Sequence, residues 1–531
     1  NKMEESFWKQ FEKDIIFHND KLNIVESCVD RHALKNPNKI AFVFELEKGK
    51  LLKYTYKELQ IEVNKFANYL NQVGVKEGSR VFLFLPKVPE MYINFLGTIK
   101  QGSIAIPLFE AFESGGLELR LDRGDANVLV TNKELLERLK HTENRKISVP
   151  FKSGKFEGKD KFKSMKIIVI DSEEFKNKIK KQNTRFNAVL KNKEDTFLMI
   201  FTSSTAGTPV AGIEISNYAL VQQHYTAKLV LGLNSEDKYW CTAHPGWVTG
   251  SVYGIIAPLS IGCENYVYIP HFNASRWIEF LNKNKISVVY TAPTALRLLR
   301  NSVKKKDLEN IKNMCSVGEA LTPGIYEFYK KLGVDINDTY WQTETGAMVI
   351  ANWIGLKKKK RSMGKAIPGI DAKIIEETIH LKPKWPAMMT GIYKHNKMYK
   401  SYFEKGWFKT NDMAKEDKDG YFFFIGRKDD IIKTSGERVS PLEIEDVLMK
   451  HKSVKEAAVV GIPDKIKGQI IKAFVVLNNG FVAENKLAEE LKLFVKENYA
   501  GHSYPREIEF VKSLPRTNSG KIIRMKLREG N

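Results

Sequence analysis

The segment at residues 338–346, with the sequence DTYWQTETG, gathers carboxylates, hydroxyls, an amide and two aromatic rings ahead of a glycine. It is too polar for a core strand and too short for a helix, so we expect a loop that holds a ligand. A carboxylate among hydroxyl and amide groups suits a divalent cation on a polyphosphate, because magnesium prefers oxygen ligands. The alternative is a solvated, threonine-rich connector.

A second polar segment at 203–212, SSTAGTPVAG, follows an apolar run and precedes a stretch that we expect to be helical. Hydroxyls and unhindered backbone N–H groups of this kind can bind phosphate. The GxxxxGK[ST] spacing of a Walker loop occurs nowhere in the chain. A surface turn is the alternative, since Ser, Thr and Gly are also typical of turns.

Charged residues near the C-terminus could also contact a ligand. Lys521 ends the glycine-hinged run LPRTNSGK, from which a lysine can bring a point charge to a carboxylate or phosphate. Asp412 could bind ribose hydroxyls, while Arg427 and Arg438 could contact phosphates. The alternatives are a solvated lysine and surface ion pairs of little energetic value.

The elements that must position these residues are predicted to form an α/β fold. Short apolar, β-branched runs alternate with amphipathic stretches, which indicates mostly parallel sheets covered by helices. Ligands of such sheets usually bind beyond the carboxyl ends of the strands. The expected strands are 81–85, 104–108, 128–131, 167–171, 197–202 and 288–291, and the expected helices include 91–100 and 274–284.

The last ~100 residues are predicted to form a separate, small α+β domain, of a size that can just hold its own core. Helices are expected at 441–450 and 485–495, and strands at 456–461 and 473–477. The charged run GRKDD at 426–430 lies at the join and is the predicted hinge. The Lys-rich stretch at 142–187 is expected to be a surface excursion.

Composition narrows the class of protein. At 531 residues the chain is too long for one core and is expected to form two or more domains. Lys and Arg exceed Asp and Glu by 22 charges, but the excess is spread along the chain without a nucleic-acid-binding signature. We therefore predict small polyanions, such as nucleotides, rather than nucleic acid as partners.

The same survey bears on the compartment. No uncharged apolar run is long enough to span a membrane, and the first residues lack the pattern of a signal peptide. The four cysteines form no CxxC pair, so neither a disulfide framework nor a zinc site is indicated. We therefore expect a cytoplasmic protein in a reducing environment.

Taken together and in this order, the segments resemble the adenylate-forming superfamily of acyl-CoA synthetases, luciferases and peptide-synthetase adenylation domains. The resemblance is greatest to the AMP-forming acetyl-CoA synthetases and covers nearly the whole chain. Its landmarks are PLFEAF at 107–112, PGWVTG at 245–250, SVGEA at 316–320 and YWQTETG at 340–346. It implies a ligase that first joins a carboxylate to AMP with release of pyrophosphate, and then transfers the acyl group to CoA.

The resemblance also implies an architecture and a set of ligands. We expect a large N-terminal domain at 1–426, a hinge at 427–430 that includes Asp429, and a mobile C-terminal domain at 431–531. The expected ligands are Mg²⁺, ATP, CoA and a short carboxylate such as acetate. We expect no nucleic acid and no membrane span, and either a monomer or a homo-oligomer.

Individual residues match functional positions of the family. Lys521 matches the catalytic lysine, Glu344 the magnesium-associated glutamate, and Ser435 with Gly436 a loop that contacts CoA. The implied ATP and AMP contacts are Ser203, Ser204, Thr205, Gly207, Gly318, Glu319, Ala320, Asp338, Thr339, Tyr340, Trp341, Gln342, Thr343, Asp412, Arg427 and Arg438. The implied acyl pocket consists of Trp247, Val248, Thr249, Val317 and Trp341, whose large indole leaves room for only a very short acyl chain.

Some positions depart from the family pattern. In the phosphate segment Ser204 replaces a glycine, Ala206 a threonine and Val210 a lysine, and further on Asn411 replaces a glycine. Losing a charge-assisted contact commonly costs ~1.5–3 kcal/mol, enough to slow turnover. Two alternatives to an acetyl-CoA synthetase therefore stay open: a propionyl- or medium-chain acyl-CoA synthetase, and a non-catalytic protein that binds a nucleotide or an acyl-adenylate.

Overall fold

The computed structural model describes residues 7–112, 114–140, 165–201, 211–428, 430–434, 437–464, 468–498, 504–516 and 522–529. Several of the predicted site residues lie outside these ranges: Ser203, Ser204, Thr205, Gly207, Asp429, Ser435, Gly436 and Lys521. For Arg438 the structure describes the backbone, which pairs with Lys433 in a short antiparallel ladder.

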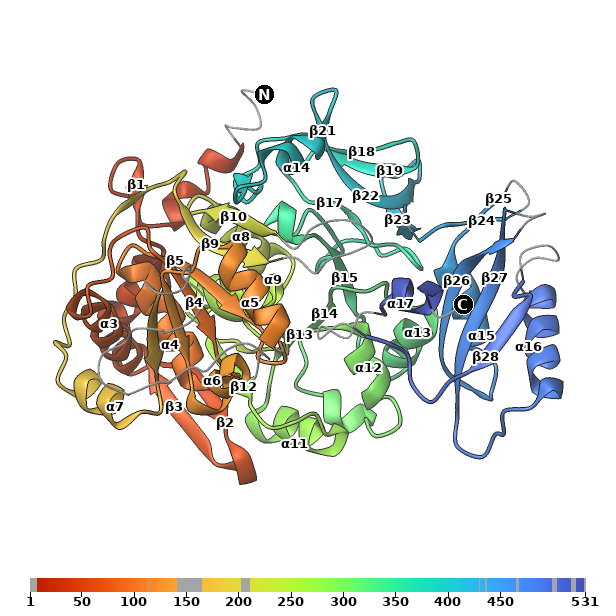
Figure 1. The fold of residues 1–531 in the computed structure, drawn as a ribbon, viewed down its shortest axis with the longest axis horizontal. Coiled ribbons are helices and arrows are strands. Elements are labelled where there is room, and N and C mark those ends of the chain that lie inside the picture. The colour runs from red at the N-terminus through yellow and green to blue at the C-terminus, as the bar shows by residue number, and fades with distance from the viewer. Residues whose placement is uncertain are drawn as a thin grey trace.

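Two large, mostly parallel sheets form the frame of the N-terminal part (Figure 1). In the described residues one sheet has seven strands, in the order β20 (Gly391–Ile392), β10 (Gly212–Ser216), β9 (Thr196–Phe201), β5 (Ile104–Leu108), β4 (Arg80–Phe84), β6 (Val128–Thr131) and β7 (Lys166–Val169). The other has nine: β17 (Lys365–Ala366), β16 (Ile350–Ala351), β15 (Asn337–Tyr340), β14 (Asn313–Ser316), β13 (Val288–Thr291), β11 (Lys238–Cys241), β12 (Glu264–Tyr268), β2 (Ile40–Glu45) and β3 (Leu51–Thr55).

Strand β4 shows how one strand serves two layers, because successive side chains of a strand point to opposite faces. Val81 and Leu83 belong to one buried cluster, and Phe82 and Phe84 belong to another. The first cluster includes side chains of α3 (Tyr56–Gln72) and α4 (Pro89–Lys100), and the second includes side chains of α5 (Ser114–Arg123) and α6 (Lys133–Lys140).

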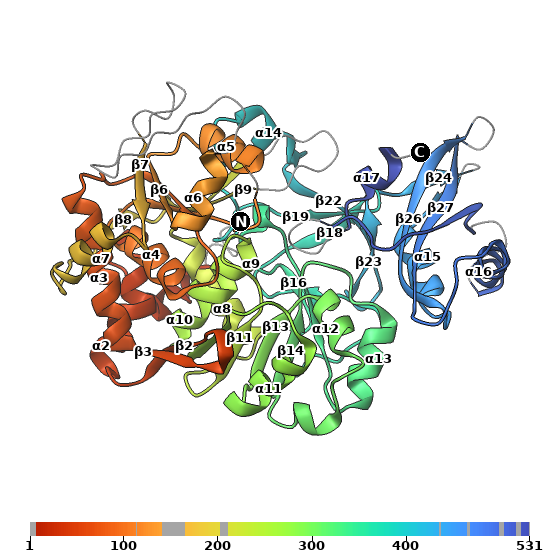
Figure 2. The ribbon, with the colours of Figure 1, turned by 60° about the horizontal axis from the view of Figure 1, so that its bottom comes forward.

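The nine-stranded sheet is covered on its outer face by helices that Figure 2 shows beside β13 and β14. These helices are α11 (Ala274–Asn284), α12 (Pro293–Leu299) and α13 (Pro323–Lys331). Between the two sheets lie α8 (Ala219–Leu229), α9 (Val248–Ser251), the π-helical turn η5 (Val252–Ile256) and α10 (Ala257–Ile261). Both faces of each sheet are thus buried, as parallel sheets require.

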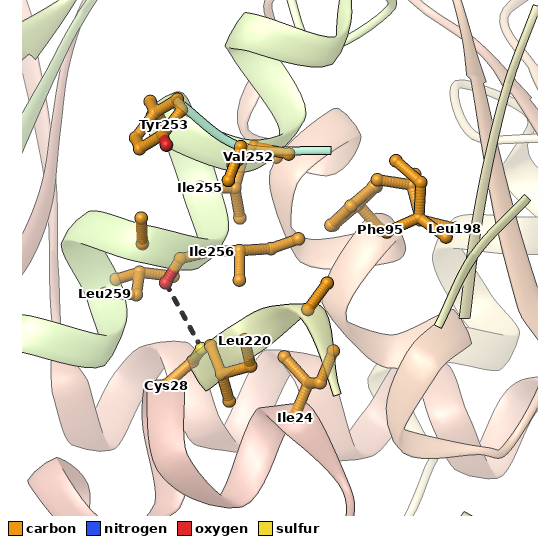
Figure 3. Close-up of a cluster of buried hydrophobic side chains, with 14 of the residues drawn as sticks. Ile24, Cys28, Phe95, Leu198, Leu220, Val252, Tyr253, Ile255, Ile256 and Leu259 are labelled. Atoms are coloured by element: carbon orange, nitrogen blue, oxygen red, sulfur yellow. Dashed lines mark hydrogen bonds between the residues drawn. The ribbon is translucent and has the colours of Figure 1, made fainter. Parts of the chain in front are cut away.

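The core between the sheets consists mainly of buried apolar side chains (Figure 3). Phe95 of α4 and Leu198 of β9 face the apolar side chains of η5, including Ile255 and Ile256. The buried thiol of Cys28 donates to the carbonyl of Ile256 at 3.3 Å. All four cysteines are free thiols, in agreement with the prediction that they form no disulfide framework.

Smaller sheets complete the chain. An antiparallel sheet follows the nine-stranded one and contains β18 (Ala372–Ile375), β19 (Thr378–Leu381), β22 (Trp407–Glu416), β21 (Phe403–Glu404) and β23 (Phe422–Arg427). Further described elements of the N-terminal part are β1 (Lys21–Leu22), β8 (Lys191–Asn192), α2 (Arg31–Lys35), α7 (Glu173–Lys180) and α14 (Asn396–Ser401).

The C-terminal part lies at one end of the long axis in both views (Figures 1 and 2). It has its own buried apolar clusters, made of side chains between residues 432 and 527. Its elements are β24 (Ile432–Thr434), β25 (Glu437–Val439), α15 (Pro441–Leu448), β26 (Val454–Asp464), β27 (Gly468–Leu477), α16 (Asn485–Asn498), β28 (Glu507–Phe510) and α17 (Arg524–Glu529).

The predicted α/β fold is confirmed, with three corrections of detail. The stretch after 203–212 is the strand β10, antiparallel to β9, and not a helix. Residues 337–340 form the buried strand β15, although the segment from 338 on was predicted to be a loop. The Lys-rich stretch 142–187, where the structure describes it, contains β7 of the sheet and α7, whose Phe175 is buried, so it is not merely a surface excursion.

Candidate functional site

The polar strand β15 is stable inside the protein because its side chains find partners on neighbouring strands. Ser316, at the end of the parallel strand β14, donates to Asp338 Oδ1 at 2.7 Å, and the backbone N–H of Thr339 donates to the same oxygen at 3.1 Å. Thr339 Oγ1 donates to the carbonyl of Ser316 at 2.7 Å. Burial raises the pKa of Asp338 to about 7, so its carboxyl is only partly ionised near neutral pH.

Trp341 follows β15 directly and is fixed by an aromatic cluster. Its indole Nε1 donates to the hydroxyl of Tyr290 at 3.0 Å, and the ring of Tyr253 meets it edge to face at 5.0 Å between centroids. Val317, the residue after β14, belongs to the same buried cluster. Because ring packing and a hydrogen bond both hold the indole, it offers a rigid wall.

The other predicted walls of the acyl pocket come from helix α9. Val248 and Thr249 are half-buried at its start, and Val248 packs against the central core. Trp247 precedes the helix and lies 5.5 Å from the ring of Phe109. The chain continues from α9 into η5, which carries Tyr253 against Trp341. The structure therefore connects α9 and Trp341 through one short helical segment.

Asp412 lies where β22 meets the end of β15. Its Oδ2 accepts from the hydroxyl of Tyr340 at 2.8 Å and from Gln342 Nε2 at 2.6 Å. On the neighbouring strand β23, Arg427 stands opposite it, with Nε 3.8 Å from Asp412 Oδ1. Asn411, where the family pattern has glycine, adopts a left-handed φ of 60°. Asparagine tolerates this conformation better than other side chains, so the replacement keeps the local backbone path.

Glu344 lies in a short 3₁₀ turn, Thr343–Thr345. Its carboxylate accepts from the hydroxyl of Tyr402 at 3.0 Å, and burial is the main cause that raises its pKa. The turn ends at Gly346, whose φ is 67°. A Cβ at this position would lie 1.8 Å from the carbonyl oxygen of Ala387, so the close approach of the two backbones requires glycine.

The segment 318–320 borders the same region on the side of β14. Gly318 has a φ of 89°, which turns the chain sharply after Val317. Both oxygens of Glu319 lie 2.8 Å from Thr294 Oγ1, which donates to that carboxylate. Ala320 is half-buried. The ends of β14 and β15 thus bring two separate predicted segments to one edge of the sheet, where ligands of parallel sheets bind.

A family profile described as "AMP-binding enzyme" matches residues 29–386, about two thirds of the chain, and "AMP-binding enzyme C-terminal domain" matches residues 443–521. The chain belongs to the AMP-binding enzyme family. This match confirms the adenylate-forming superfamily predicted from the sequence motifs.

Similar proteins agree with this assignment. The acetyl-coenzyme A synthetase of Bacillus subtilis is 41% identical over 527 residues, which is 96% of this chain and 90% of the relative. A crystal structure of an acyl-CoA synthetase from Brucella canis is 30% identical, has a TM-score of 0.74 and is matched over 98% of this chain and 96% of its own. An anthranilate CoA ligase in complex with anthranoyl-AMP is 25% identical, with a TM-score of 0.85 over 96% of this chain and 98% of its own. The predicted class of enzyme, an AMP-forming acid–thiol ligase, is therefore confirmed.

In this AMP-binding enzyme the sequence motifs did not reveal every residue of the site. Tyr402, the partner of Glu344, and Tyr290 with Tyr253, the partners of Trp341, lie outside the motifs or carry no local signal. The histidine before the PGWVTG landmark, His244, lies with Nε2 2.9 Å from Glu110 of the PLFEAF landmark. This contact brings the PLFEAF and PGWVTG landmarks together, although more than a hundred residues separate them in the sequence.

The described residues of the enzyme contain no cluster of three or more His, Cys, Asp or Glu side chains that could hold a metal ion alone. Glu344 supplies one half-buried carboxylate, which fits a cation that is also held by the phosphates of its substrate. No helix in the described part of the chain is long and apolar enough to cross a membrane.

Proposed function

We propose that this protein is an acetate–CoA ligase that forms AMP. In the first step an acetate oxygen attacks the α-phosphorus of ATP, and the bond between that phosphorus and the α,β-bridging oxygen breaks to release pyrophosphate. In the second step the CoA thiolate attacks the acyl carbon of acetyl-adenylate, and AMP leaves. The 41% identity to an acetyl-coenzyme A synthetase over 90% of its length supports the reaction.

The observation that carries the choice of acid is the fixed indole of Trp341. Its hydrogen bond to Tyr290 and its edge contact with Tyr253 hold the ring where β15 ends. A rigid wall at the end of an acyl pocket excludes longer chains, at ~1–3 kcal/mol for each methylene refused. We infer that Val248 and Thr249 complete this pocket.

The nucleotide is proposed to lie along the ends of β14, β15 and β22. Asp412 would bind the ribose hydroxyls, with Arg427 beside it and with Tyr340 and Gln342 fixing its carboxylate. Residues 318–320 and 338–340 would line the adenine. Preorganised groups of this kind stabilise the charge that develops in phosphoryl transfer.

We propose that Mg²⁺ enters with ATP and contacts Glu344. Magnesium is usually held by one or two carboxylates together with substrate phosphates, which fits the half-buried carboxylate of Glu344. When bound, the cation neutralises charge on the phosphates. The role of the protein is to hold the Glu344 carboxylate in place through Tyr402 and the 3₁₀ turn.

We further propose the division into residues 1–426, a hinge at 427–430 with Asp429, and a mobile domain at 431–531. The separate apolar clusters between residues 432 and 527 support it. In this scheme Lys521 bridges acetate and the α-phosphate in the first step, and Ser435 with Gly436 faces CoA in the second. Cytoplasmic placement is part of the same proposal.

Product analysis tests the function directly. The purified enzyme is incubated with ATP, Mg²⁺, CoA and a panel of acids from acetate to octanoate. Acetyl-CoA and AMP in equal amounts, with acetate preferred, are expected. ADP as the product, or a preference for longer acids, would contradict the proposal.

The altered residues Ser204, Ala206 and Val210 favour a second candidate, a non-catalytic protein that binds a nucleotide or an acyl-adenylate. Acetate-dependent exchange of pyrophosphate into ATP separates the two. Exchange is expected for the ligase, and no exchange at high enzyme concentration would favour the binding protein.

A further inference from the structure

We propose that a cavity between α2, α8 and α10 is a binding site for a small phosphorylated polyol or sugar. The cavity has a volume of about 400 Å³, within the range of small-ligand sites. Its walls come from separate elements of the N-terminal part, and none of its residues belongs to the acetate–CoA ligase site described above. It is lined by Lys13, Asp14, Arg31, His32, Lys35, Asn36, Lys39, His224, Ser235, Ser260, Ile261 and Gly262.

The charge of the lining selects an anion. Four cationic residues face one carboxylate, Asp14. Lys39 is held by the carbonyl of Ser235, whereas Lys13 and Lys35 are exposed and, in the part of the chain that the structure describes, have no ion pair. The ammonium groups of these two lysines line the cavity and attract a compact dianion such as a phosphate monoester.

The inner wall is fixed by backbone contacts, so it is formed before any ligand binds. Arg31 donates to the carbonyl of Asp14 at 2.7 Å and to the carbonyl of Ser260 at 2.5 Å. The ring of His32 lies against Gly262, where a Cβ would be 2.6 Å from the ring. A guanidinium held in this way keeps further N–H groups in a defined direction, which suits phosphate.

His224 determines what else the ligand must offer. This side chain is 7% exposed, and its Nδ1 lies 2.9 Å from Ser260 Oγ. Ser260 donates its own proton to the carbonyl of Ala257, so Nδ1 must be the donor to Ser260. Burial, and then Arg31, lowers the pKa of His224 to about 4, so the ring is neutral and Nε2 is an acceptor. A ligand hydroxyl beside the phosphate would satisfy it.

Isothermal titration calorimetry of the full-length enzyme at fixed ionic strength tests the site, with glycerol 3-phosphate and inorganic phosphate as probes. The wild type is expected to bind glycerol 3-phosphate at least tenfold more tightly than phosphate. Lys13→Gln with Lys35→Gln should weaken both probes at least tenfold. The matched control, Lys305→Gln with Lys306→Gln, removes the same charge from exposed residues outside the cavity and should bind as the wild type does.

The role of His224 has its own variant. His224→Leu should keep phosphate binding and lose the preference for glycerol 3-phosphate; if it fails to fold in a thermal unfolding check, His224→Gln replaces it. Absence of binding at millimolar probe, equal loss in both double-lysine variants, or binding retained in both would overturn the site. If the His224 variant kept the wild-type preference for glycerol 3-phosphate over phosphate, the proposal that the ligand is a phosphorylated polyol or sugar would be overturned. None of these results depends on whether the enzyme ligates acetate.

Discussion

At the scale of single residues, Trp341 gives the acid specificity a physical basis that can be tested. Trp341→Gly should open the acyl pocket and raise kcat/KM for propionate relative to acetate by roughly 10–200-fold, because the one extra methylene accommodated is worth ~1–3 kcal/mol. The measurement is steady-state kinetics over straight-chain acids from two to eight carbons.

The hydrogen bond to Trp341 provides the control. Tyr290→Phe removes the hydroxyl that accepts from the indole N–H of Trp341. It keeps the aromatic ring at position 290, which contacts Tyr253. This variant should make the Trp341 indole only slightly more mobile, so the preference for acetate should change by no more than a few-fold. No gain for longer acids in Trp341→Gly would show that the indole packs the core without limiting chain length.

Asp338 predicts a pH dependence of stability. Its pKa in the folded state is about 7, above the ordinary 3.8. The folded protein therefore holds this proton more tightly than the unfolded chain, and stability from this group is present below about pH 4 and lost as the pH rises through 7. The difference of about three between these two pKa values limits the stability lost at high pH to about 4 kcal/mol.

Asp338→Asn should remove this loss, because an amide oxygen can still accept from Ser316 and from the Thr339 N–H. Its unfolding temperature should exceed that of the wild type at pH 8 by more than at pH 5. Asp20→Asn makes the same change at an exposed position and serves as the control. An equal effect at both pH values would contradict the burial of an ionisable carboxyl.

At the scale of elements, the turn that carries Glu344 depends on backbone contacts with its neighbours. Gln222 and Gln223 of α8 donate to the carbonyls of Met348 and Gly346 at 3.0 and 3.1 Å. Trp385 Nε1 donates to the carbonyl of Thr345 at 2.9 Å. The position of the Glu344 carboxylate is thus set by a helix and a loop that are distant in sequence.

Gly346→Ala should break this arrangement. The added methyl would clash with Ala387 and would also occupy a left-handed backbone conformation, which alone costs roughly 1–2 kcal/mol. Gly355→Ala isolates the second effect, since Gly355 has a φ of 90° with open space around it. We expect Gly346→Ala to lower kcat at least tenfold and to unfold several degrees below Gly355→Ala. If both variants had the same kcat and the same unfolding temperature, the proposed clash between a methyl group at position 346 and Ala387 would be refuted.

The same elements show how much the sequence could predict. The predicted bounds are correct for strands β5, β6 and β13 and for helix α11. The spacing of apolar residues that predicts them can be read within each segment alone. Strand β15 was missed, since its polar side chains are stabilised by Ser316 and Tyr290, which lie far away in the chain. The antiparallel sheet around β22 and the role of Tyr402 were not foreseen either, because both depend on long-range pairing.

At the scale of the whole molecule, helix α17 of the C-terminal part is tied to Asp430, the last residue of the proposed hinge. Arg528 Nη2 lies 2.9 Å from Asp430 Oδ1, and Arg524 contacts both Asp430 and the buried Glu445. Both arginines belong to α17, which begins three residues after Lys521. If the C-terminal part rotates about residues 427–430, the segment with Lys521 must therefore move with it.

This connection leads to a prediction about the two half-reactions. Lys521→Ala should lower adenylation, measured as acetate-dependent ATP–pyrophosphate exchange, by at least ~100-fold, because a single charge-stabilising donor is commonly worth that much. Thioester formation from supplied acetyl-adenylate and CoA should stay within a few-fold of the wild type, since Lys521 would then point away from the site. Lys526→Ala, an exposed position on α17, should leave both steps unchanged. Equal loss of both steps in Lys521→Ala would mean that one arrangement of the two parts serves both reactions.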